Sequence, residues 1–328
     1  MDDKLRTLFP ESFLRIEVVG KTNYFLPYRE ALVESIQKLG FEARGFEEIN
    51  YGYNPDGFLI INPLHYRNED FRNRYFLYAG IQTEQMPNQE VYCVDFGKDK
   101  YEMFRRYYHK YDFIFEWSPS SYRFLRERYE RVFFLPHCSF SQMKYGNLEK
   151  VTPEPYDLFF AGSPIGVRGR REKLLKALGE RYRLYPQVRN LWGEEKGRGI
   201  LSSKICLNIH FDHSLVFESP RIYEYMSNKK FVLSERMADS YPFVPGVDYG
   251  EFQIRNLFDR VDYYLSHDEE RERIAENGHA KAGSFKLDDH VSIILDRFLM
   301  EKGYRMSRQD HDRKALWPRK TGFPRGRK

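Results

Sequence analysis

Short apolar runs and helically spaced apolar residues alternate along the whole chain. The apolar runs end at glycine, proline or polar residues and predict buried strands at residues 14–20, 56–63, 76–82, 112–115, 131–136, 157–162, 184–186, 205–210 and 231–234. Apolar residues at helical spacing predict helices at residues 28–39, 101–111, 120–129, 170–181, 220–227, 256–266, 268–282 and 290–302, with a further helical stretch beginning at 199. This alternation favours an α/β fold with parallel sheets covered by helices on both faces.

A polar stretch interrupts the alternation at residues 141–155, which contain Gly146, Pro153 and Pro155 and predict a linker. We therefore expect a first doubly wound domain at residues 1–145, a linker at 146–155 and a second doubly wound domain at 156–301. Ligands of open α/β sheets bind at the carboxyl ends of the strands, so two such domains predict a central cleft.

The composition argues against a membrane-spanning protein and against a secreted one. The 328 residues are 41% hydrophobic, no uncharged apolar run approaches the ~20 residues of a membrane span, and the first residues lack the apolar core of a secretion signal. The three cysteines, Cys93, Cys138 and Cys206, are widely spaced, which argues against a disulfide framework or a zinc site and fits a cytoplasmic location. Aromatic residues reach 17%, which fits either a bulky core or an aromatic cleft.

Positive charge is concentrated at the end of the chain. Residues 302–328 contain ten Lys or Arg against two Asp, a net charge of +8, which leaves −3 of the total of +5 for residues 1–301. We expect a basic C-terminal tail that is either solvated or in contact with an anionic polymer or membrane surface.

The most informative local signal is a helix start at Ser219-Pro220. Serine at the N-cap and proline in the first turn favour a helix here, and its free N–H groups suit a diphosphate. Arg221 is unfavourable for the helix dipole, which suggests phosphate binding. Glu224 lies on the same face and could accept both hydroxyls of a ribose, although a surface ion pair between Arg221 and Glu224 is an equal alternative.

A second signal is the small-residue loop after the strand at 157–162. Gly162 and Ser163 lead into an arginine-rich helix start with Arg168 and Arg170, which could hold phosphate groups. The loop lacks the Gly-Lys-Ser/Thr end of a Walker A loop, and a simple turn is an equal alternative.

Single residues at strand ends complete the candidates. Glu84 follows an apolar strand and could act as a general base, and His210 precedes the helix at Ser219. His137 is another lone histidine, and a structural role is the commoner one for both histidines. No His-Glu-x-x-His motif is present, and we interpret Asp310-His311-Asp312 as a chance match, so no metal site is expected.

The second half resembles the C-terminal domain of GT-B glycosyltransferases, in particular the CgeB-like (spore-maturation-protein-like) branch of the group 1 enzymes. The resemblance covers residues 156–300 and rests on these segments in order: Phe160–Ser163, Arg170-Arg171, Trp192–Glu194, Lys204–His210, Ser219–Arg221 with Glu224, Gly246–Tyr249, and Tyr264–Arg271 with Ile274-Ala275 and Gly278. The first half matches only in its α/β alternation and in Thr83–Gln85.

The resemblance implies two Rossmann-like domains, with the acceptor held by the first and a nucleotide-diphosphate sugar, most often a UDP-sugar, by the second. It implies no further cofactor and no metal, because the helix dipole and basic side chains stabilise the departing diphosphate. In this pattern Glu224 holds the ribose, and Glu218 is the nearest match to the family's first glutamate, although its spacing departs from Glu-x7-Glu. The loop at Trp192-Gly193 is the candidate for binding the base of the nucleotide, and His210 is the candidate for binding the sugar or a phosphate.

Two other functions remain open. One is a non-catalytic protein that binds a sugar nucleotide or an anionic polymer. The other is an enzyme that glycosylates a modified nucleic-acid base, which the basic tail would favour.

Overall fold

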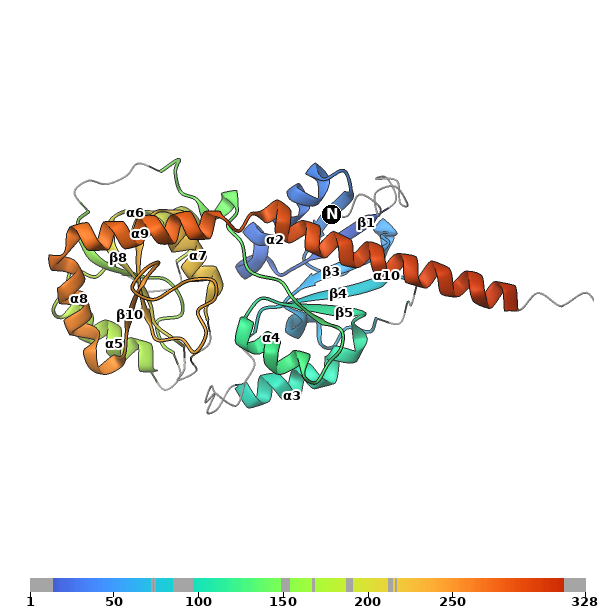
Figure 1. The fold of residues 1–328 in the computed structure, drawn as a ribbon, viewed down its shortest axis with the longest axis horizontal. Coiled ribbons are helices and arrows are strands. Elements are labelled where there is room, and N and C mark those ends of the chain that lie inside the picture. Colours follow the sequence, from blue (N-terminus) through green and yellow to red (C-terminus); the bar gives the residue numbers. More distant parts are fainter. Residues whose placement is uncertain are drawn as a thin grey trace, which may run out of the picture.

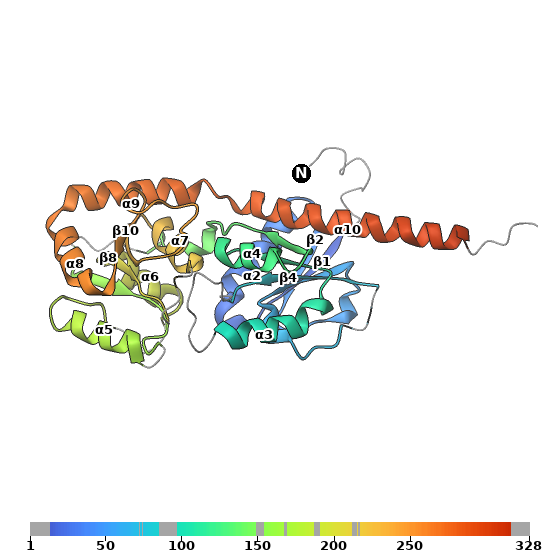
Figure 2. The same ribbon diagram turned by 60° about the horizontal axis from the view of Figure 1, so that its bottom comes forward.

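Two parallel β-sheets, each flanked by helices, form the molecule (Figure 1). The computed structural model describes residues 14–71, 73, 75–84, 97–148, 154–166, 169–186, 191–211, 215 and 217–315. Every strand pair within these residues is parallel, as the sequence predicts. The two sheets lie in separate lobes, and one long helix runs along the lobe of the first sheet (Figures 1 and 2).

The first sheet has the strand order β2-β1-β3-β4-β5-β6. Its strands are β1 (Arg15–Val19), β2 (Glu42–Phe46), β3 (Gly57–Ile61), β4 (Leu77–Gln82), β5 (Phe113–Glu116) and β6 (Val132–Phe134). The helices of this half are α2 (Thr22–Lys38), α3 (Gly97–Tyr107) and α4 (Pro119–Arg126). Strands β3, β4 and β5 are buried along their whole length, as expected for central strands covered on both faces. Strand β2 escapes the sequence analysis because it is a mostly exposed edge strand without an apolar run.

The second sheet has the order β10-β9-β8-β7, with β7 (Tyr156–Phe160), β8 (Ser203–Asn208), β9 (Phe231–Glu235) and β10 (Gly250–Phe252). The predicted strand at 184–186 is reduced to one parallel bridge between Leu184 and Leu158, which lies on the side of β7 opposite β8. Counting this bridge, the order matches that of the first five strands of the first sheet, so successive strands are added on opposite sides of β7, with the switch point between β7 and β8. Such a switch point is where open α/β sheets bind ligands.

The helices of the second half are α5 (Arg170–Gly179), α6 (Gly193–Leu201), α7 (Ser219–Ser227), α8 (Leu257–Ser266) and α9 (Asp268–Gly283). Helix α6 begins at Gly193, six residues before the predicted start at 199. The sequence analysis misses this beginning because Glu194-Glu195-Lys196 carries no apolar periodicity.

The last helix, α10 (Leu287–Ala315), belongs to the first sheet rather than the second. It packs on α2 and β4, Asp288 accepts a hydrogen bond from Ser35 at 2.9 Å, and Lys302 bonds Asp56 at 2.8 Å. The predicted domain 156–301 is therefore wrong at its end, because residues 287–301 lie against the first half. Residues 302–315 of the predicted basic tail continue α10, and residues 316–328 lie outside the described residues.

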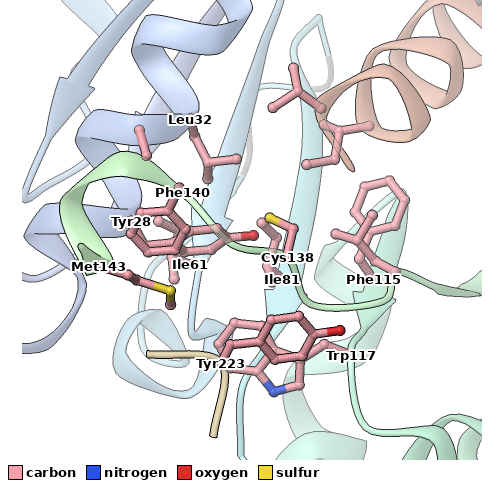
Figure 3. Close-up of a cluster of buried hydrophobic side chains, with 14 of the residues drawn as sticks. Tyr28, Leu32, Ile61, Ile81, Phe115, Trp117, Cys138, Phe140, Met143 and Tyr223 are labelled. Atoms are coloured by element: carbon pink, nitrogen blue, oxygen red, sulfur yellow. The ribbon is translucent and has the colours of Figure 1, made fainter. Parts of the chain in front are cut away.

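A continuous hydrophobic cluster spans the two halves through the segment at 138–145. Phe140 and Met143 are buried in it beside Tyr28 of α2 and Tyr223 of α7 (Figure 3). Tyr145 is buried in the same cluster. Two hydrogen bonds reinforce this contact, from Tyr145 N–H to Asn228 Oδ1 at 2.8 Å and between the Ser139 and Ser227 hydroxyls at 2.9 Å. The predicted linker thus begins directly after a buried segment that joins the halves.

Candidate active site

Two cavities lie between the halves. The smaller, of 310 Å³, is lined by Thr83, Glu84, Trp117, Ser118, Arg171, Phe211, Phe217, Glu218, Pro220 and Arg221. The larger, of 480 Å³, is lined from the second half by Ala161, Gly162, Ser163, Leu191, Trp192, Gly193, Lys196, Pro220, Arg221 and Glu224, and otherwise by residues of the first half and of the joining segment. Trp117, Pro220 and Arg221 line both cavities, so the two are neighbours at the start of α7.

The start of α7 differs in detail from the prediction. Glu218 occupies the N-cap position, Ser219 is the first helical residue and Pro220 follows it. The Ser219 hydroxyl is buried and has no hydrogen-bond partner, so Ser219 is not the capping residue that we predict from the sequence. Pro220 and Arg221, in the first turn of α7, still line both cavities, so this end of the helix lies at the site.

Glu218 is held between two arginines. Its carboxylate forms an ion pair with Arg221, and Arg171 Nη2 lies 3.2 Å from Oε1. Burial raises the pKa of Glu218, but Arg221 and Arg171 outweigh burial and hold it well below its usual range. The cluster of two arginines and one carboxylate therefore carries a net positive charge at the start of α7.

Arg221 has a second set of contacts that fixes its side chain. Nη1 donates to Asn208 Oδ1 at the end of β8 at 2.7 Å, and the guanidinium lies 5.1 Å from the Phe160 ring centroid. Gly162, with φ +142°, allows this arrangement, because a Cβ there would lie 2.7 Å from Arg221 Nη2. Ser163 accepts a hydrogen bond from Arg171 Nη1 at 3.2 Å through its carbonyl.

His210 and Arg170 lie beneath the site and line neither cavity. Arg170 donates to the His210 carbonyl at 2.9 Å and pairs with Glu235. His210 is buried, with Nδ1 3.7 Å from Glu218 Oε1 and Nε2 3.0 Å from the Arg236 carbonyl. Burial lowers the pKa of His210, but the Glu218 carboxylate outweighs this and raises it overall. Both residues support Glu218 and the strand ends, their predicted contact with the donor stays a prediction, and Arg168 lies outside the described residues.

Glu224 lies one turn further along α7, in the wall of the larger cavity. Its Oε1 accepts a hydrogen bond from the Tyr145 hydroxyl at 2.8 Å and lies 2.8 Å from Lys196 Nζ. The surface pair between Arg221 and Glu224 that the spacing allows is therefore replaced by two separate pairs, Arg221–Glu218 and Glu224–Lys196. Lys196 Nζ also lies 5.4 Å from the centroid of the half-exposed Trp192 ring, beside Gly193 at the start of α6.

Glu84 lies in the smaller cavity and comes from the opposite half. Its Oε1 accepts a hydrogen bond from Asn62 Nδ2 at 3.1 Å, and the N–H groups of Thr83 and Glu84 bond Gln82 Oε1 at 3.1 and 3.4 Å. Strands β3 and β4 end side by side, so their terminal residues hold this carboxylate across the cavity from α7.

Three contributors to the site are not among the predicted site residues: Arg171, Lys196 and Tyr145. Arg171 precedes Leu174, Leu175 and Leu178 by three, four and seven residues, which is a helical signal that it faces inward. Lys196 and Tyr145 have no local signal, because each meets Glu224 only through the tertiary fold.

Within the part of the chain that the structure describes, no group of three or more His, Cys, Asp or Glu side chains could hold a metal ion. A search of the same residues finds no helix long and apolar enough to span a membrane.

Part of the second half of the chain is similar in sequence to a known family. Residues 167–289 match a family of proteins described as glycosyl transferase-like, a region that contains α7 and its neighbours. No curated protein sequence matches the chain significantly.

Solved structures share the fold over most of the chain. Anabaena Alr3699/HepE in complex with UDP and glucose is 9% identical, with a TM-score of 0.59 over 88% of this chain and 99% of that one. Sucrose-phosphate synthase from Thermosynechococcus elongatus is 11% identical, with a TM-score of 0.60 over 90% and 100%. A putative UDP-N-acetylglucosamine 2-epimerase from Listeria monocytogenes is 12% identical, with a TM-score of 0.55 over 86% and 95%. The protein therefore has the two-lobed α/β architecture of GT-B proteins.

Proposed function

We propose that the protein is a glycosyltransferase of the CgeB-like branch that moves a sugar from a nucleotide-diphosphate sugar, with UDP as the nucleotide, to a hydroxyl acceptor. One observation carries the proposal: Arg221 and the start of α7 lie where two cavities meet, with Glu224 in one and Glu84 in the other. The glycosyl transferase-like match of residues 167–289 and the UDP complex of the HepE neighbour support the choice of substrate.

The larger cavity suits the nucleoside. Glu224 offers carboxylate oxygens to the two ribose hydroxyls, and Trp192 offers a flat apolar surface for the base. Lys196 and Tyr145 hold the Glu224 carboxylate in place, which reduces the conformational entropy lost on binding.

The start of α7 suits the diphosphate. The cluster of Arg171, Arg221 and Glu218 carries about one net positive charge, and the first N–H groups of α7 add the partial positive charge of a helix N-terminus. In the reaction the bond between the sugar carbon and the diphosphate oxygen breaks, and these groups stabilise the charge on the leaving diphosphate.

The smaller cavity suits the transferred sugar and the reacting hydroxyl. Glu84 takes the proton from the acceptor hydroxyl while the oxygen of that hydroxyl bonds to the sugar carbon. Asn62 orients this carboxylate, while His210 and Arg170 support Glu218 and the strand ends from beneath. We propose that neither a metal nor a further cofactor takes part, and that the protein works in the cytoplasm, where its buried cysteines Cys138 and Cys206 remain reduced.

A thermal-shift screen tests the donor. We expect UDP and one UDP-sugar to stabilise the protein by roughly 2.7 kcal/mol at about 100 times the dissociation constant, with or without EDTA. GDP, ADP and CMP serve as matched controls. Loss of the shift in EDTA would contradict the metal-free mechanism, and no shift with any nucleotide would favour a non-catalytic protein.

A product assay tests the reaction. Incubation with the stabilising UDP-sugar and a set of acceptors, followed by mass spectrometry, should show UDP and a glycosylated product. Conversion of UDP-N-acetylglucosamine to its 2-epimer without an acceptor would instead indicate an epimerase, the activity named for the Listeria neighbour.

Polymer binding by the basic end of the chain remains the alternative that the charge pattern favours. A truncation after Ala315 tests it and leaves α10 whole, whereas a cut after Glu301 would remove the Lys302–Asp56 contact. Salt-dependent binding of nucleic acid that this truncation abolishes would favour the nucleic-acid alternative.

A further inference from the structure

A buried histidine in the wall of the larger cavity has no hydrogen-bond partner among the residues that the structure describes. His137 is 3% exposed, and neither Nδ1 nor Nε2 bonds any group. It follows β6, in the segment that joins the two halves, and it lines the 480 Å³ cavity. Buried polar groups in proteins are paired in the great majority of cases, so each exception requires an explanation.

The neighbouring His290 shows what a satisfied histidine looks like in the same region. His290 Nδ1 lies 2.9 Å from the Pro136 carbonyl, and its Nε2 bonds the Tyr28 hydroxyl. Burial lowers the pKa of both histidines, so both imidazoles are neutral at pH 7. A neutral imidazole has one N–H donor and one acceptor nitrogen. The fold uses both groups of His290 but neither group of His137, whose side chain belongs to the cavity wall.

Aromatic rings from both halves surround His137. Its ring centroid lies 4.8 Å from that of Trp117, 5.1 Å from Tyr223 and 5.9 Å from Tyr28. Figure 3 shows these three rings in one buried cluster with Phe140 and Met143, which also line the cavity.

The two walls of the larger cavity differ in charge. Its charged lining residues, Lys196, Arg221 and Glu224, come from α6 and α7 of the second half. The lining residues that precede the second sheet are uncharged: Phe25, Pro27, Tyr28, Trp117, His137, Phe140, Gln142, Met143 and Tyr145. One wall therefore suits an anionic nucleotide, and the other suits a neutral group with an apolar or ring-shaped face.

We propose that His137 hydrogen-bonds a hydroxyl of the sugar acceptor, and that the acceptor is an uncharged, ring-bearing compound that packs on the aromatic wall. The inference rests on the proposed glycosyl transfer and names its acceptor class. A hydroxyl matches a neutral imidazole because it also donates one hydrogen bond and accepts others. Pyranose and aromatic rings both match flat aromatic side chains, which bury the apolar faces of such rings.

The position of Trp117 connects the aromatic wall of the larger cavity to the smaller cavity, where the proposed reaction takes place. Trp117 contacts His137 in the larger cavity and also lines the smaller cavity with Glu84. An acceptor that lies along Trp117 can therefore place one hydroxyl near His137 and another near Glu84. His137 would then be a binding residue rather than the base, because its lowered pKa makes it a weak proton acceptor.

The first test measures the stability of the free, full-length protein. His137→Leu removes an unpaired buried polar group, so we expect its melting temperature to equal or exceed that of the wild type. His290→Leu is the matched control: it removes a paired imidazole, so its melting temperature should fall by several degrees. A fall of the same size in His137→Leu would show a structural role for His137 and overturn the proposal.

The second test measures acceptor binding by calorimetry in the presence of saturating UDP. The probes are p-nitrophenyl β-glucopyranoside, which is neutral, and p-nitrophenyl β-glucuronide, which differs by one carboxylate. We expect the wild type to bind the glucoside about tenfold more tightly than the glucuronide. His137→Leu should weaken glucoside binding by about tenfold, and His137→Asn, which keeps one donor and one acceptor, should restore most of it.

Three results would overturn the proposal: tighter binding of the glucuronide, unchanged glucoside binding by His137→Leu, or no binding of either probe by wild-type protein that binds UDP. Affinity for UDP separates this failure from failure of the proposed function. If only the acceptor class is wrong, the wild type and both His137 variants still bind UDP alike, whereas a protein that is not a glycosyltransferase of this kind binds no UDP-sugar.

Discussion

The Tyr145 hydroxyl donates a hydrogen bond to Glu224 Oε1 across 2.8 Å and so joins the segment between the two halves to the middle of α7. Lys196 of α6 approaches the same oxygen to 2.8 Å. Glu224 is thus held from two further elements before any ligand arrives. A carboxylate held in this way binds a ribose with a small loss of side-chain entropy.

Replacement of Glu224 tests the ribose contact. Glu224→Gln should weaken UDP binding by about tenfold or more, because a hydrogen bond to a charged group contributes roughly 1.5–3 kcal/mol. Titration calorimetry with UDP measures the change. Glu276→Gln is the control, since Glu276 pairs with Lys229 at 3.2 Å on the exposed surface and should leave binding unchanged. Wild-type affinity in Glu224→Gln would remove the ribose assignment.

Replacement of Glu84 separates chemistry from donor binding. Glu84→Gln keeps the side-chain shape and the contact with Asn62 but removes the proton acceptor, so kcat should fall about 100-fold or more. UDP affinity should stay within about twofold, because the proposed nucleotide contacts come from the second half. Steady-state kinetics and calorimetry on the same preparations measure both. The control is Glu48→Gln, which alters an exposed partner of Lys21 in the same half. An unchanged kcat in Glu84→Gln would exclude Glu84 as the base.

Replacement of Gly162 tests how far the position of Arg221 depends on the loop after β7. An alanine there would place its Cβ 2.7 Å from Arg221 Nη2 and would adopt φ +142° at a conformational cost of about 1–3 kcal/mol. We expect Gly162→Ala to lower both the melting temperature and the affinity for UDP. Gly246→Ala is the matched control, because Gly246 has φ +77° but no atom within 4 Å of the added Cβ, so it should cost stability without loss of UDP binding. Equal UDP affinities in the two variants would show that Arg221 does not depend on Gly162.

Glu116 at the end of β5 predicts a pH dependence of stability. Its carboxyl is fully buried, Oε1 accepts from the Ser118 N–H at 2.8 Å, and Oε2 has no partner. Burial raises the pKa of Glu116 well above its usual range, although the backbone N–H groups of Ser118 and Trp117 oppose this. The folded state therefore binds a proton that the unfolded state releases above about pH 4.5. The stability that this proton provides is complete below that pH and is lost as the pH rises toward the folded-state pKa.

Glu116→Gln should accordingly raise the melting temperature at pH 8, because it keeps the shape and the Oε1 acceptor without a titrating proton. The difference from the wild type should shrink as the pH falls toward about 4.5, where both side chains are neutral. Thermal unfolding from pH 4.5 to 8 measures it. Glu127→Gln, at an exposed site beside Arg128, should show no such trend. A constant difference across this pH range would mean that Glu116 is not protonated in the folded state.

The local sequence determined much of the secondary structure of this protein. The buried strands β3, β4 and β5 and the start of α7 at Ser219-Pro220 follow from short apolar runs and from one helix-start signal, because each depends on residues within a few positions. The order of strands and helices also predicted that Glu84 follows the end of a strand and that Arg221 lies in the first turn of a helix at the cleft, and the structure places both in one cavity.

Only the tertiary structure decided which distant residues form hydrogen bonds and which sheet each helix packs on. Tyr145 and Glu224 are 79 residues apart, and nothing in either segment indicates their hydrogen bond. Helix α10 follows the second sheet in the chain yet packs on the first, and its periodicity is the same whichever sheet it covers. The same reason explains His137: a pattern of apolar and polar residues shows that a histidine is buried, but its missing hydrogen bonds are a property of every group around it.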